Sequence, residues 1–318
     1  MEKKDVGGSV ELIAGFAGGI ASSLATHPLD VIKTRLQVHQ SKPGSTNSRP
    51  LTTIDVARSF RKAKNPLTAA YRGASISLVA NSASWACFFQ FKDMFERHIV
   101  SQGYHGMTSG KKPNNMGYFV SSGLAGIATS CITNPLWVIR TRITSTAREK
   151  AGAYPNMRAA AMHIYQGEGL GGFYKGLGIA FVGTSHGAIQ FTIYERLRNK
   201  YIKKQQREHN QNPEKLADET TVAISTLSKV VAHVATFPHT VVRNRLQNQS
   251  DTSTYGKGIL GVGRRMWQES GIRPFYRGVV PTVLKTLPAT CVMLLVVENL
   301  RYYLPRWLAD TEDRVSRE

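Results

Sequence analysis

The sequence predicts an all-α membrane protein with six transmembrane helices in three pseudo-symmetric repeats, each repeat also carrying a short helix. Three observations lead to this fold class. A proline-centred motif occurs three times at nearly constant spacing, a second motif follows each copy, and long stretches between them are almost free of charge. Self-similarity at a fixed period is the sequence signature of a repeat architecture.

The first motif reads THPLDVIKTRLQ, TNPLWVIRTRIT and TFPHTVVRNRLQ, and its prolines are Pro28, Pro135 and Pro238. Each copy is followed by a tyrosine, a basic residue and a glycine. These turns end at Gly73, Gly176 and Gly278. Three matched pairs of motifs in the same order indicate three copies of one structural unit.

Each copy predicts a long helix through the proline, a polar loop, a short amphipathic helix and a second long helix. The first long helices contain the nearly uncharged stretches 12–29, 118–139 and 221–242. The short helices are expected at 54–63, 157–166 and 259–269. The second long helices are expected at 75–98, 178–201 and 281–303.

The domain organisation follows from these elements. The repeats are expected at 10–100, 116–203 and 219–304, with an N-terminal tail at 1–9 and a C-terminal tail at 305–318. Helices of about 25 residues are long enough to cross a bilayer with some tilt. Their Gly/Ala/Ser/Thr content suits helices that pack together around a polar cavity, and Gly15/Gly19 and Ser122/Gly126 are spaced for close backbone approach.

The charge balance predicts an anionic partner. Lys and Arg number 41 against 21 Asp and Glu, a net charge of +20, which favours nucleic acid, anionic lipid or a phosphorylated or carboxylated solute. Basic residues gather near the short helices, and by the positive-inside rule that side faces the inner compartment. They are Arg58, Arg61, Lys62, Lys64, Arg148, Lys150, Arg158, Arg264 and Arg265.

Several other classes are disfavoured. The three cysteines lie outside any CxxC or Cys/His cluster, so neither a disulfide framework nor a metal site is expected, and the N-terminus lacks a secretory signal. GTSHG at 183–187 fits the nucleophile-elbow spacing of hydrolases but lies inside a helical repeat, so no catalytic residue is expected. GGFYKGL at 171–177 lacks the Lys-Ser/Thr of a P-loop. A basic nucleic-acid-binding protein stays a remote alternative.

The repeated motif resembles P-x-[DE]-x-x-[KR], the signature of the mitochondrial carrier family, solute carrier family 25, and the resemblance covers nearly the whole chain. It implies transport rather than catalysis, by alternating access to one central cavity through two gates. It also implies a multi-pass protein of the mitochondrial inner membrane, with both termini in the intermembrane space and one chain sufficient for function. No cofactor is expected other than the transported solute.

The resemblance places a matrix gate at the three prolines and the charged residues after them. Of the three acidic positions only Asp30 is acidic, because Trp137 and Thr240 occupy the other two. Asp30 is therefore expected to pair with Arg140, and Trp137 either blocks the gate or simply packs. The residues of this gate are Pro28, Asp30, Lys33, Pro135, Trp137, Arg140, Pro238, Thr240 and Arg243.

A second, cytoplasmic gate resembles the family's [FY][DE]-x-x-[RK] element in the second helices. YERLR at 194–198 fits fully, VENLR at 297–301 lacks the aromatic residue, and KDMFE at 92–96 has an acid where a base is expected. The expected pairs are Asp93 with Arg198 and Glu195 with Arg301. Glu96 is left opposite Glu298, and two like charges should not bond.

The substrate site is expected at mid-membrane. PLW, GTSHGAIQFTIYE, LSKVV and LKTLPATCVMLLVVENL look like the FAD/folate carrier branch, with NAD and pyrimidine-nucleotide carriers as the alternative. The Pro-His-Thr of the third motif departs from that branch. The expected substrate-binding residues are Ala80, Asn81, Ser84, Gly183, His186, Gln190, Lys229, Lys285 and Thr286. Lys229 and Lys285 would bind anionic groups, whereas Lys229 could be a structural pair and His186 a packing residue.

The three Tyr-basic-Gly turns are the expected lipid sites. Gly73, Gly176 and Gly278 precede helices whose backbone N–H groups and dipoles attract phosphate, and the family resemblance implies cardiolipin there.

Overall fold

Three long helices that each run through a motif proline form the centre of the protein. The computed structural model describes residues 2–39, 51–104, 106–109, 112–146, 153–209, 218–249 and 258–315. The three helices are α1 (Glu2–Val38), α5 (Asn115–Ser145) and α9 (Asp218–Asn248). They contact one another pairwise, as three copies around a central axis would.

The remaining elements follow the predicted order in each repeat. The second long helices are α4 (Ala74–Gln102), the pair α7 (Leu177–Gly183) and α8 (Ser185–His209), and α11 (Val279–Val315). The short ones are α2 (Thr53–Lys62), α3 (Pro66–Ala70), α6 (Met157–Phe173), α10 (Gly258–Ser270) and the 3-10 turn η1 (Arg273–Tyr276). A small hairpin of β1 (Thr108–Ser109) and β2 (Lys112–Pro113) joins the first two repeats.

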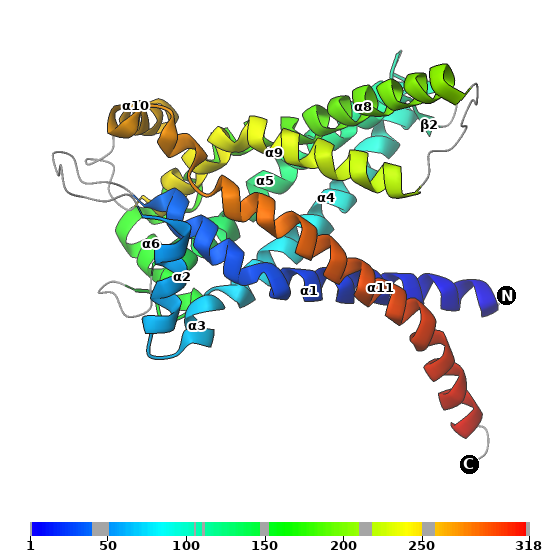
Figure 1. Cartoon of the computed structure of the whole chain (residues 1–318), viewed down its shortest axis with the longest axis horizontal. Helices are drawn as coiled ribbons and strands as arrows, with labels where there is room; N and C mark the ends of the chain where they lie inside the picture. The colour runs from blue at the N-terminus through cyan, green and yellow to red at the C-terminus, as the bar shows by residue number, and fades with distance from the viewer. Residues whose placement is uncertain are drawn as a thin grey trace.

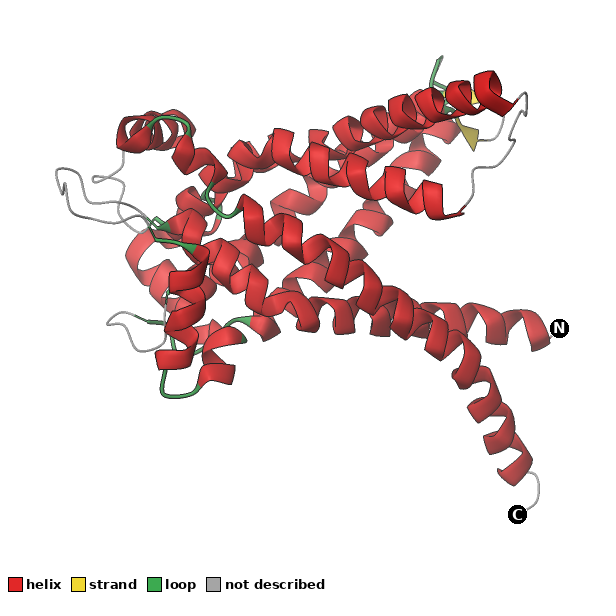
Figure 2. Cartoon of the chain, in the orientation of Figure 1, coloured by secondary structure: helices red, strands yellow, loops and turns green. Residues whose placement is uncertain are grey.

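The short helices lie at one end of the molecule and both termini lie at the other (Figure 1). α1 packs along α11, α4 along α5, and α8 along α9. Apart from the small hairpin, the described residues are helical or in turns (Figure 2). The basic side chains of the short helices share the end away from the termini. Arg148 and Lys150 lie outside the described residues.

The motif prolines lie inside continuous helices, and a threonine stands two residues before each one. Thr26, Thr133 and Thr236 each donate their hydroxyl to the carbonyl four residues back, at 2.7–2.8 Å. Such back-bonding bends a helix, and proline removes a further backbone hydrogen bond. The Thr-x-Pro sequence therefore provides two causes for the kink that brings three helix ends together.

The basic residue of each Tyr-basic-Gly turn joins one repeat to the next. Arg72 Nε donates to the carbonyl of Ile143 at 2.8 Å, and Lys175 Nζ donates to that of Gln249 at 2.7 Å. In the third repeat Arg277 Nη1 donates to the carbonyl of His39 at 3.0 Å, which closes the ring. These bonds satisfy carbonyls at the ends of the proline-containing helices, which lack partners within their own helix.

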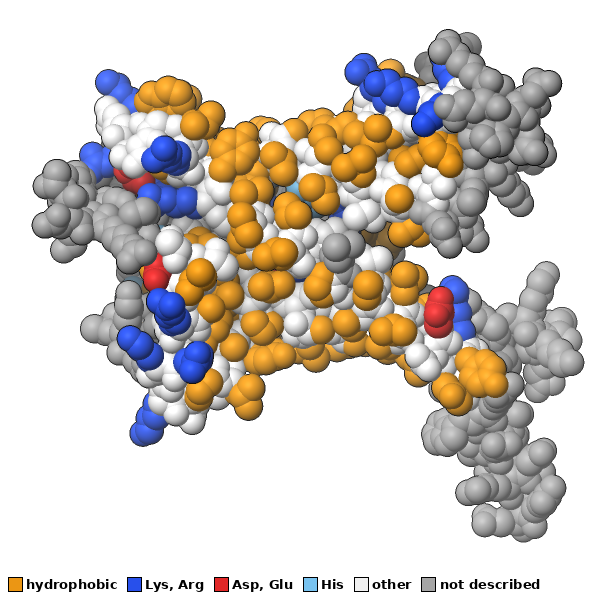
Figure 3. All heavy atoms as spheres, viewed as in Figure 1, with side chains coloured by type: hydrophobic (Ala, Val, Ile, Leu, Met, Phe, Trp, Pro, Cys, Tyr) orange, Lys and Arg blue, Asp and Glu red, His pale blue; other side chains and the backbone are white. Residues whose placement is uncertain are grey.

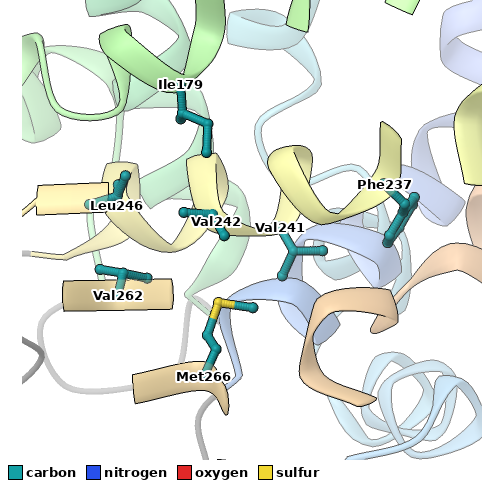
Figure 4. Close-up of a cluster of buried hydrophobic side chains, with 7 residues drawn as sticks. All are labelled: Ile179, Phe237, Val241, Val242, Leu246, Val262 and Met266. Atoms are coloured by element: carbon teal, nitrogen blue, oxygen red, sulfur yellow. The ribbon is translucent and has the colours of Figure 1, made fainter. Parts of the chain in front are cut away.

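Each repeat has its own hydrophobic cluster at the short-helix end. In the third repeat, side chains of α9 and α10 face each other, with Ile179 above them, as Figure 4 shows. Met266, on α10, is fully buried against this cluster. Equivalent clusters join α1 to α2 and α5 to α6. Burial of these apolar faces fixes the short helices, as their amphipathic pattern predicts.

The helices are longer than predicted. Helix α1 begins at Glu2 and α11 ends at Val315, so both predicted tails are largely helical. No proline interrupts the first residues, which explains why α1 extends to the N-terminus. The helix expected at 178–201 is divided at Thr184 instead. There the hydroxyls of Thr184 and Ser185 donate to carbonyls three residues back, at 2.7 and 2.6 Å, and compete with regular helical bonding.

The predicted close-approach spacing of Gly15 and Gly19 is wrong, because a Cβ at either position would meet no atom within 4 Å. The buried small residues on this part of α1 are instead Ala14 and Gly18. A Cβ on Gly18 would lie 2.8 Å from Val297. The spacing itself is right, but the face of α1 that turns toward α11 is shifted by one residue. At Gly126 the prediction is correct, since a Cβ there would lie 3.0 Å from Thr184.

Apolar side chains cover the middle of the face seen in Figure 3, with basic side chains toward its two ends. Large exposed apolar side chains of the molecule include Phe16, Trp85, Phe119, Phe191 and Leu295. Among the described residues, three helical segments are long and apolar enough to cross a membrane by themselves: Met116–Ser145, Thr220–Asn248 and Arg273–Tyr303. The other long helices carry more polar residues, which lowers their mean hydropathy.

A buried ion pair reinforces two of the three repeats. Glu168 accepts two hydrogen bonds from Arg142, at 2.5 and 2.8 Å, and lies 2.7 Å from Lys175. Arg245 binds Glu269 in the same way. In the second repeat Glu168 precedes the glycine of the Tyr-basic-Gly turn by eight residues. The residue at the same distance before Gly73 in the first repeat is Asn65, whose neutral amide supplies no negative charge.

We expect Glu168→Gln to lower the melting temperature of the purified protein by several degrees at neutral pH, because it leaves Arg142 buried without a counter-charge. Burial raises the pKa of Glu168, but the hydrogen bonds from Arg142 and Lys175 outweigh it and hold that pKa below its ordinary value. A lowered carboxyl pKa stabilises the fold at higher pH, and this contribution is lost as the pH falls below about 4. The difference between variant and wild type should therefore shrink in acid.

Thermal unfolding in detergent across a pH series measures this effect. Arg158→Gln, which removes an exposed charge from the same helix, is the control and should melt as the wild type does. Equal melting temperatures for Glu168→Gln and wild type at neutral pH would show that the ion pair of Glu168 with Arg142 does not stabilise the fold.

Candidate functional site

One carboxylate, Asp30, joins all three repeats at the matrix gate. Both of its oxygens accept hydrogen bonds from Lys285 Nζ, at 2.8 and 2.9 Å. The guanidinium of Arg140 lies 3.8 Å away, so the predicted pair of Asp30 with Arg140 is present. Asp30 belongs to α1, Arg140 to α5 and Lys285 to α11, and their side chains are largely buried. Lys285, expected to hold an anionic group of the substrate, is here bound to the gate.

Trp137 lies among the gate cations rather than facing outward. The guanidinium carbons of Arg140 and Arg243 lie 5.1 and 5.8 Å from the centre of its ring. Its indole N–H donates to the hydroxyl of Ser84 at 3.0 Å. A cation over an indole face is attracted by the ring quadrupole, so Trp137 partly replaces the missing acid. It offers no negative charge, however, and cannot neutralise either arginine.

The gate lies at the floor of two adjoining cavities. The first, of about 230 Å³, contains one carboxylate and four basic side chains: Asp30, Lys33, Arg140, Arg243 and Lys285. Asn81, Trp137 and Thr240 also line it. The second, of about 330 Å³, lies between α5, α7, α8 and α9. Both cavities share Lys33, His239, Thr240 and Arg243, which form the boundary between them.

Some of the expected substrate-binding residues line these cavities and others do not. Asn81 and Lys285 line the first cavity, and Gly183 and His186 line the second. Ala80 is fully buried, and Ser84 is held by Trp137. The structure does not place Gln190, Lys229 or Thr286 among the lining residues of either cavity. Lys229 is exposed, and Thr286 donates its hydroxyl to the carbonyl of Thr282 at 3.2 Å.

Two histidines in the second cavity were not predicted. His233 packs edge-on against His186, with ring centres 4.5 Å apart, and His239 lies beside Gly183. Thr236 accepts a hydrogen bond from His186 Nδ1 at 2.9 Å, since its own proton goes to the carbonyl of Ala232. His239 directly follows the proline of the third motif. The Pro-His-Thr sequence there differs from that of the FAD/folate branch, and this difference could have marked His239 as a site residue. Within the described chain the three rings form no metal-binding group.

A family model described as mitochondrial carrier protein matches three segments of the chain, residues 5–103, 111–205 and 219–306. These correspond to the three repeats that surround the gate.

The chain belongs to the mitochondrial carrier family. It is therefore a membrane transporter of small solutes, not an enzyme, and the nucleic-acid-binding alternative is wrong. GTSHG accordingly forms no nucleophile elbow, since Ser185 begins α8.

Three similar proteins transport different solutes according to their names. The mitochondrial FAD carrier protein of Saccharomyces cerevisiae is 28% identical over 306 residues, 92% of this chain and 96% of that protein. The chloroplastic nicotinamide adenine dinucleotide transporter 1 of Arabidopsis thaliana is 32% identical, covering 92% of this chain and 90% of the relative. The chloroplastic folate transporter 1 of the same plant is 31% identical, covering 90% and 92%. These relatives are mitochondrial or chloroplastic.

The carrier holds its second gate differently from the predicted arrangement. Asp93 binds Arg97 on its own helix rather than Arg198, and Glu96 lies 2.5 Å from Lys92. Glu195 and Glu298 are exposed. The helices of the carrier diverge at this end, as Figure 1 shows for α1/α11 and α8/α9. At the opposite end Asp30 is paired with Lys285 and Arg140, so residues of the predicted matrix gate are in contact, whereas the predicted pair of Asp93 and Arg198 is not formed.

The three glycines predicted as lipid sites all adopt positive φ. Gly73 and Gly176 have φ of 78° and Gly278 has 88°, a conformation that other residues rarely adopt. Each directly precedes a long helix of the carrier or its first segment. Beside Gly73 a cavity of about 360 Å³ lies between the first two repeats, lined by Arg72, Tyr71 and the N-terminus of α6.

We expect Asp30→Asn to weaken the closed matrix gate of the carrier, because four basic side chains would then share the cavity without a carboxylate. The melting temperature should fall, and a cysteine placed at the buried Thr34 should react faster with a maleimide added from the short-helix side. Labelling is measured in a background where Cys87, Cys131 and Cys291 are serine.

Asp30→Glu keeps the negative charge and is the matched control, with labelling expected near the wild-type rate. Unchanged melting and labelling in Asp30→Asn would show that the ion pair does not hold the gate.

Proposed function

We propose that the protein is a carrier of the mitochondrial inner membrane that moves a large anionic cofactor, FAD or a folate, by alternating access. The observation that carries this proposal is the charge of the gate cavity, where one carboxylate faces four basic side chains. Uncompensated cations in a low-dielectric cavity favour the binding of an anion. That cavity is lined by residues of α1, α4, α5, α9 and α11, and α7 and α8 line the adjoining one.

A flat ring system on the solute is supported by Trp137. Its indole lines the cavity and is already stacked against two arginines, so a planar heteroaromatic ring could exchange places with one of them. Trp85, another large aromatic side chain, is on α4 and is 60% exposed, and it does not line the gate cavity. FAD and folate combine a planar ring with anionic groups, and similar proteins are named for both.

The gate geometry suggests how the solute drives transport. Lys285 holds Asp30 and also lines the cavity, so an anion bound there competes with Asp30 for the ammonium group. A solute that binds the separated pair better than the closed pair shifts the equilibrium toward opening. In the opposite state, Asp93 would leave Arg97 and bind Arg198, and Glu195 would bind Arg301, closing the cytoplasmic side.

The orientation follows from the distribution of charge. Basic residues on the short helices place that end in the matrix, and both termini then lie in the intermembrane space. Gly73, Gly176 and Gly278 would bind cardiolipin phosphate at helix N-termini, with Arg72 beside the first site. One chain encloses the complete cavity, which supports a functional monomer.

An NAD or pyrimidine-nucleotide carrier is the second candidate. The similar NAD transporter is 32% identical, slightly more than the similar FAD carrier at 28%. NAD also carries a planar ring and a phosphate chain, so it suits the same cavity.

We expect liposomes containing the purified protein to take up labelled FAD or a reduced folate saturably. Lys285→Ala should abolish that uptake, because it removes the cation that binds Asp30 and the solute anion. Uptake of FAD, a reduced folate, NAD and UTP is measured in one panel, with Lys285→Arg as the charge-retaining control. Uptake of NAD or UTP alone would move the protein to the nucleotide branch. No uptake of any of the four would contradict the proposed substrate class.

A further inference from the structure

Two basic side chains at the matrix gate have lost the partners that the family motif would provide. Trp137 and Thr240 stand at the acidic positions of the second and third motifs, so only Asp30 supplies a carboxylate. Asp30 is engaged by Lys285 and Arg140. In the part of the chain that the structure describes, no ion pair reaches Lys33 or Arg243.

Arg243 is left unsatisfied in a second way. Its Nε is buried and has no hydrogen-bond partner among the described residues. Its guanidinium lies over the ring of Trp137, and the ammonium group of Lys33 lies 5.8 Å from the ring centre of Phe237. Aromatic faces attract these cations but accept no ordinary hydrogen bond from the remaining donors. A buried donor without an acceptor destabilises the protein until a ligand supplies one.

The cavity that these two cations share with α7 and α8 contains no acidic side chain among its described lining. It measures about 330 Å³, and its polar lining consists of hydroxyl groups and the rings of His186, His233 and His239. Gly126 and Gly183 line this cavity without a side chain, so the backbone itself forms part of the cavity wall there. Such a site has two fixed positive charges and several neutral polar groups, and it is adjacent to Trp137 and Lys285 across the shared boundary.

We propose that Lys33 and Arg243 form a subsite for the phosphate chain of the transported solute, and that this subsite favours a pyrophosphate over the carboxylates of a folate. The proposal rests on the proposed function, because it requires an anionic cofactor as solute. A pyrophosphate concentrates at least two negative charges on adjacent groups and accepts several hydrogen bonds, including a bidentate pair from an arginine. The carboxylates of a folate also carry one charge each, but a flexible chain separates them and each offers fewer acceptor oxygens, so they would bind the two adjacent cations less well.

Restoring the missing acid tests the subsite. In Thr240→Asp a carboxylate stands in both cavities, one helical turn before Arg243, and competes with any bound anion. Thr240→Asn is the matched neutral control of nearly the same shape. The melting temperature of the full-length protein in detergent is followed against inorganic pyrophosphate, with glutarate as a dicarboxylate of comparable charge.

We expect pyrophosphate to stabilise the wild type and Thr240→Asn, and glutarate to do so much less. Thr240→Asp should melt higher without ligand, because Arg243 gains a partner, and should bind pyrophosphate roughly 10-fold or more weakly. Should this variant not fold, Arg243→Gln is expected to show the same loss, with the exposed Lys200→Gln as its control. Wild-type affinity in Thr240→Asp or Arg243→Gln, or equal stabilisation by glutarate, would overturn the subsite.

The uptake panel separates this inference from the proposed function. If FAD is not transported but pyrophosphate binding still depends on residue 240, the subsite stands and the FAD assignment fails. If FAD is transported while pyrophosphate binding is insensitive to both substitutions, the subsite fails and the carrier assignment stands.

Discussion

The structure depends on one ionic contact, the carboxylate of Asp30 held between Lys285 and Arg140. Each of the three groups comes from a different repeat, so a single side chain joins the whole threefold unit at its centre. The outer ring of bonds from Arg72, Lys175 and Arg277 to backbone carbonyls joins the same repeats at their periphery. The outer contacts use neutral acceptors and join neighbouring repeats, whereas in the proposed mechanism the inner contact is exchanged for a solute anion.

The three repeats share a plan but differ in how strongly each is joined. Two have a buried arginine bound to a glutamate, Arg142 with Glu168 and Arg245 with Glu269. The first repeat has Asn65 instead, and its Arg35 lies against the ring of Phe60 at 5.2 Å. Pseudo-symmetry therefore describes the backbone, while the electrostatics of the carrier are asymmetric at both the periphery and the gate.

The repeats, the proline-containing helices and the short amphipathic helices could be predicted from the sequence because each has a local signal. The Asp30–Arg140 pair followed from the repeated motif. Other features depend on contacts between distant segments, which no local pattern encodes. The partner of Lys285 lies on α1, and the face of α1 toward α11 is set by packing, so the sequence indicated Gly19 where Gly18 makes the contact. Under the proposed alternating access, pairs at the predicted cytoplasmic gate would differ between states, so one sequence has to allow more than one set of pairs.

The gate cavity has a further consequence for a protein that works in an energised membrane. Its four cations and one carboxylate leave three positive charges in excess when no solute is bound. A membrane potential acts on charge displaced across the bilayer, at about 2.3 kcal/mol per elementary charge and 100 mV. A polyanionic solute cancels most of that excess, so the empty and the loaded carrier respond to the potential differently. In the proposed transport cycle, Trp137 and Thr240 at the two acidic positions would therefore make the return of the empty carrier the more voltage-sensitive half.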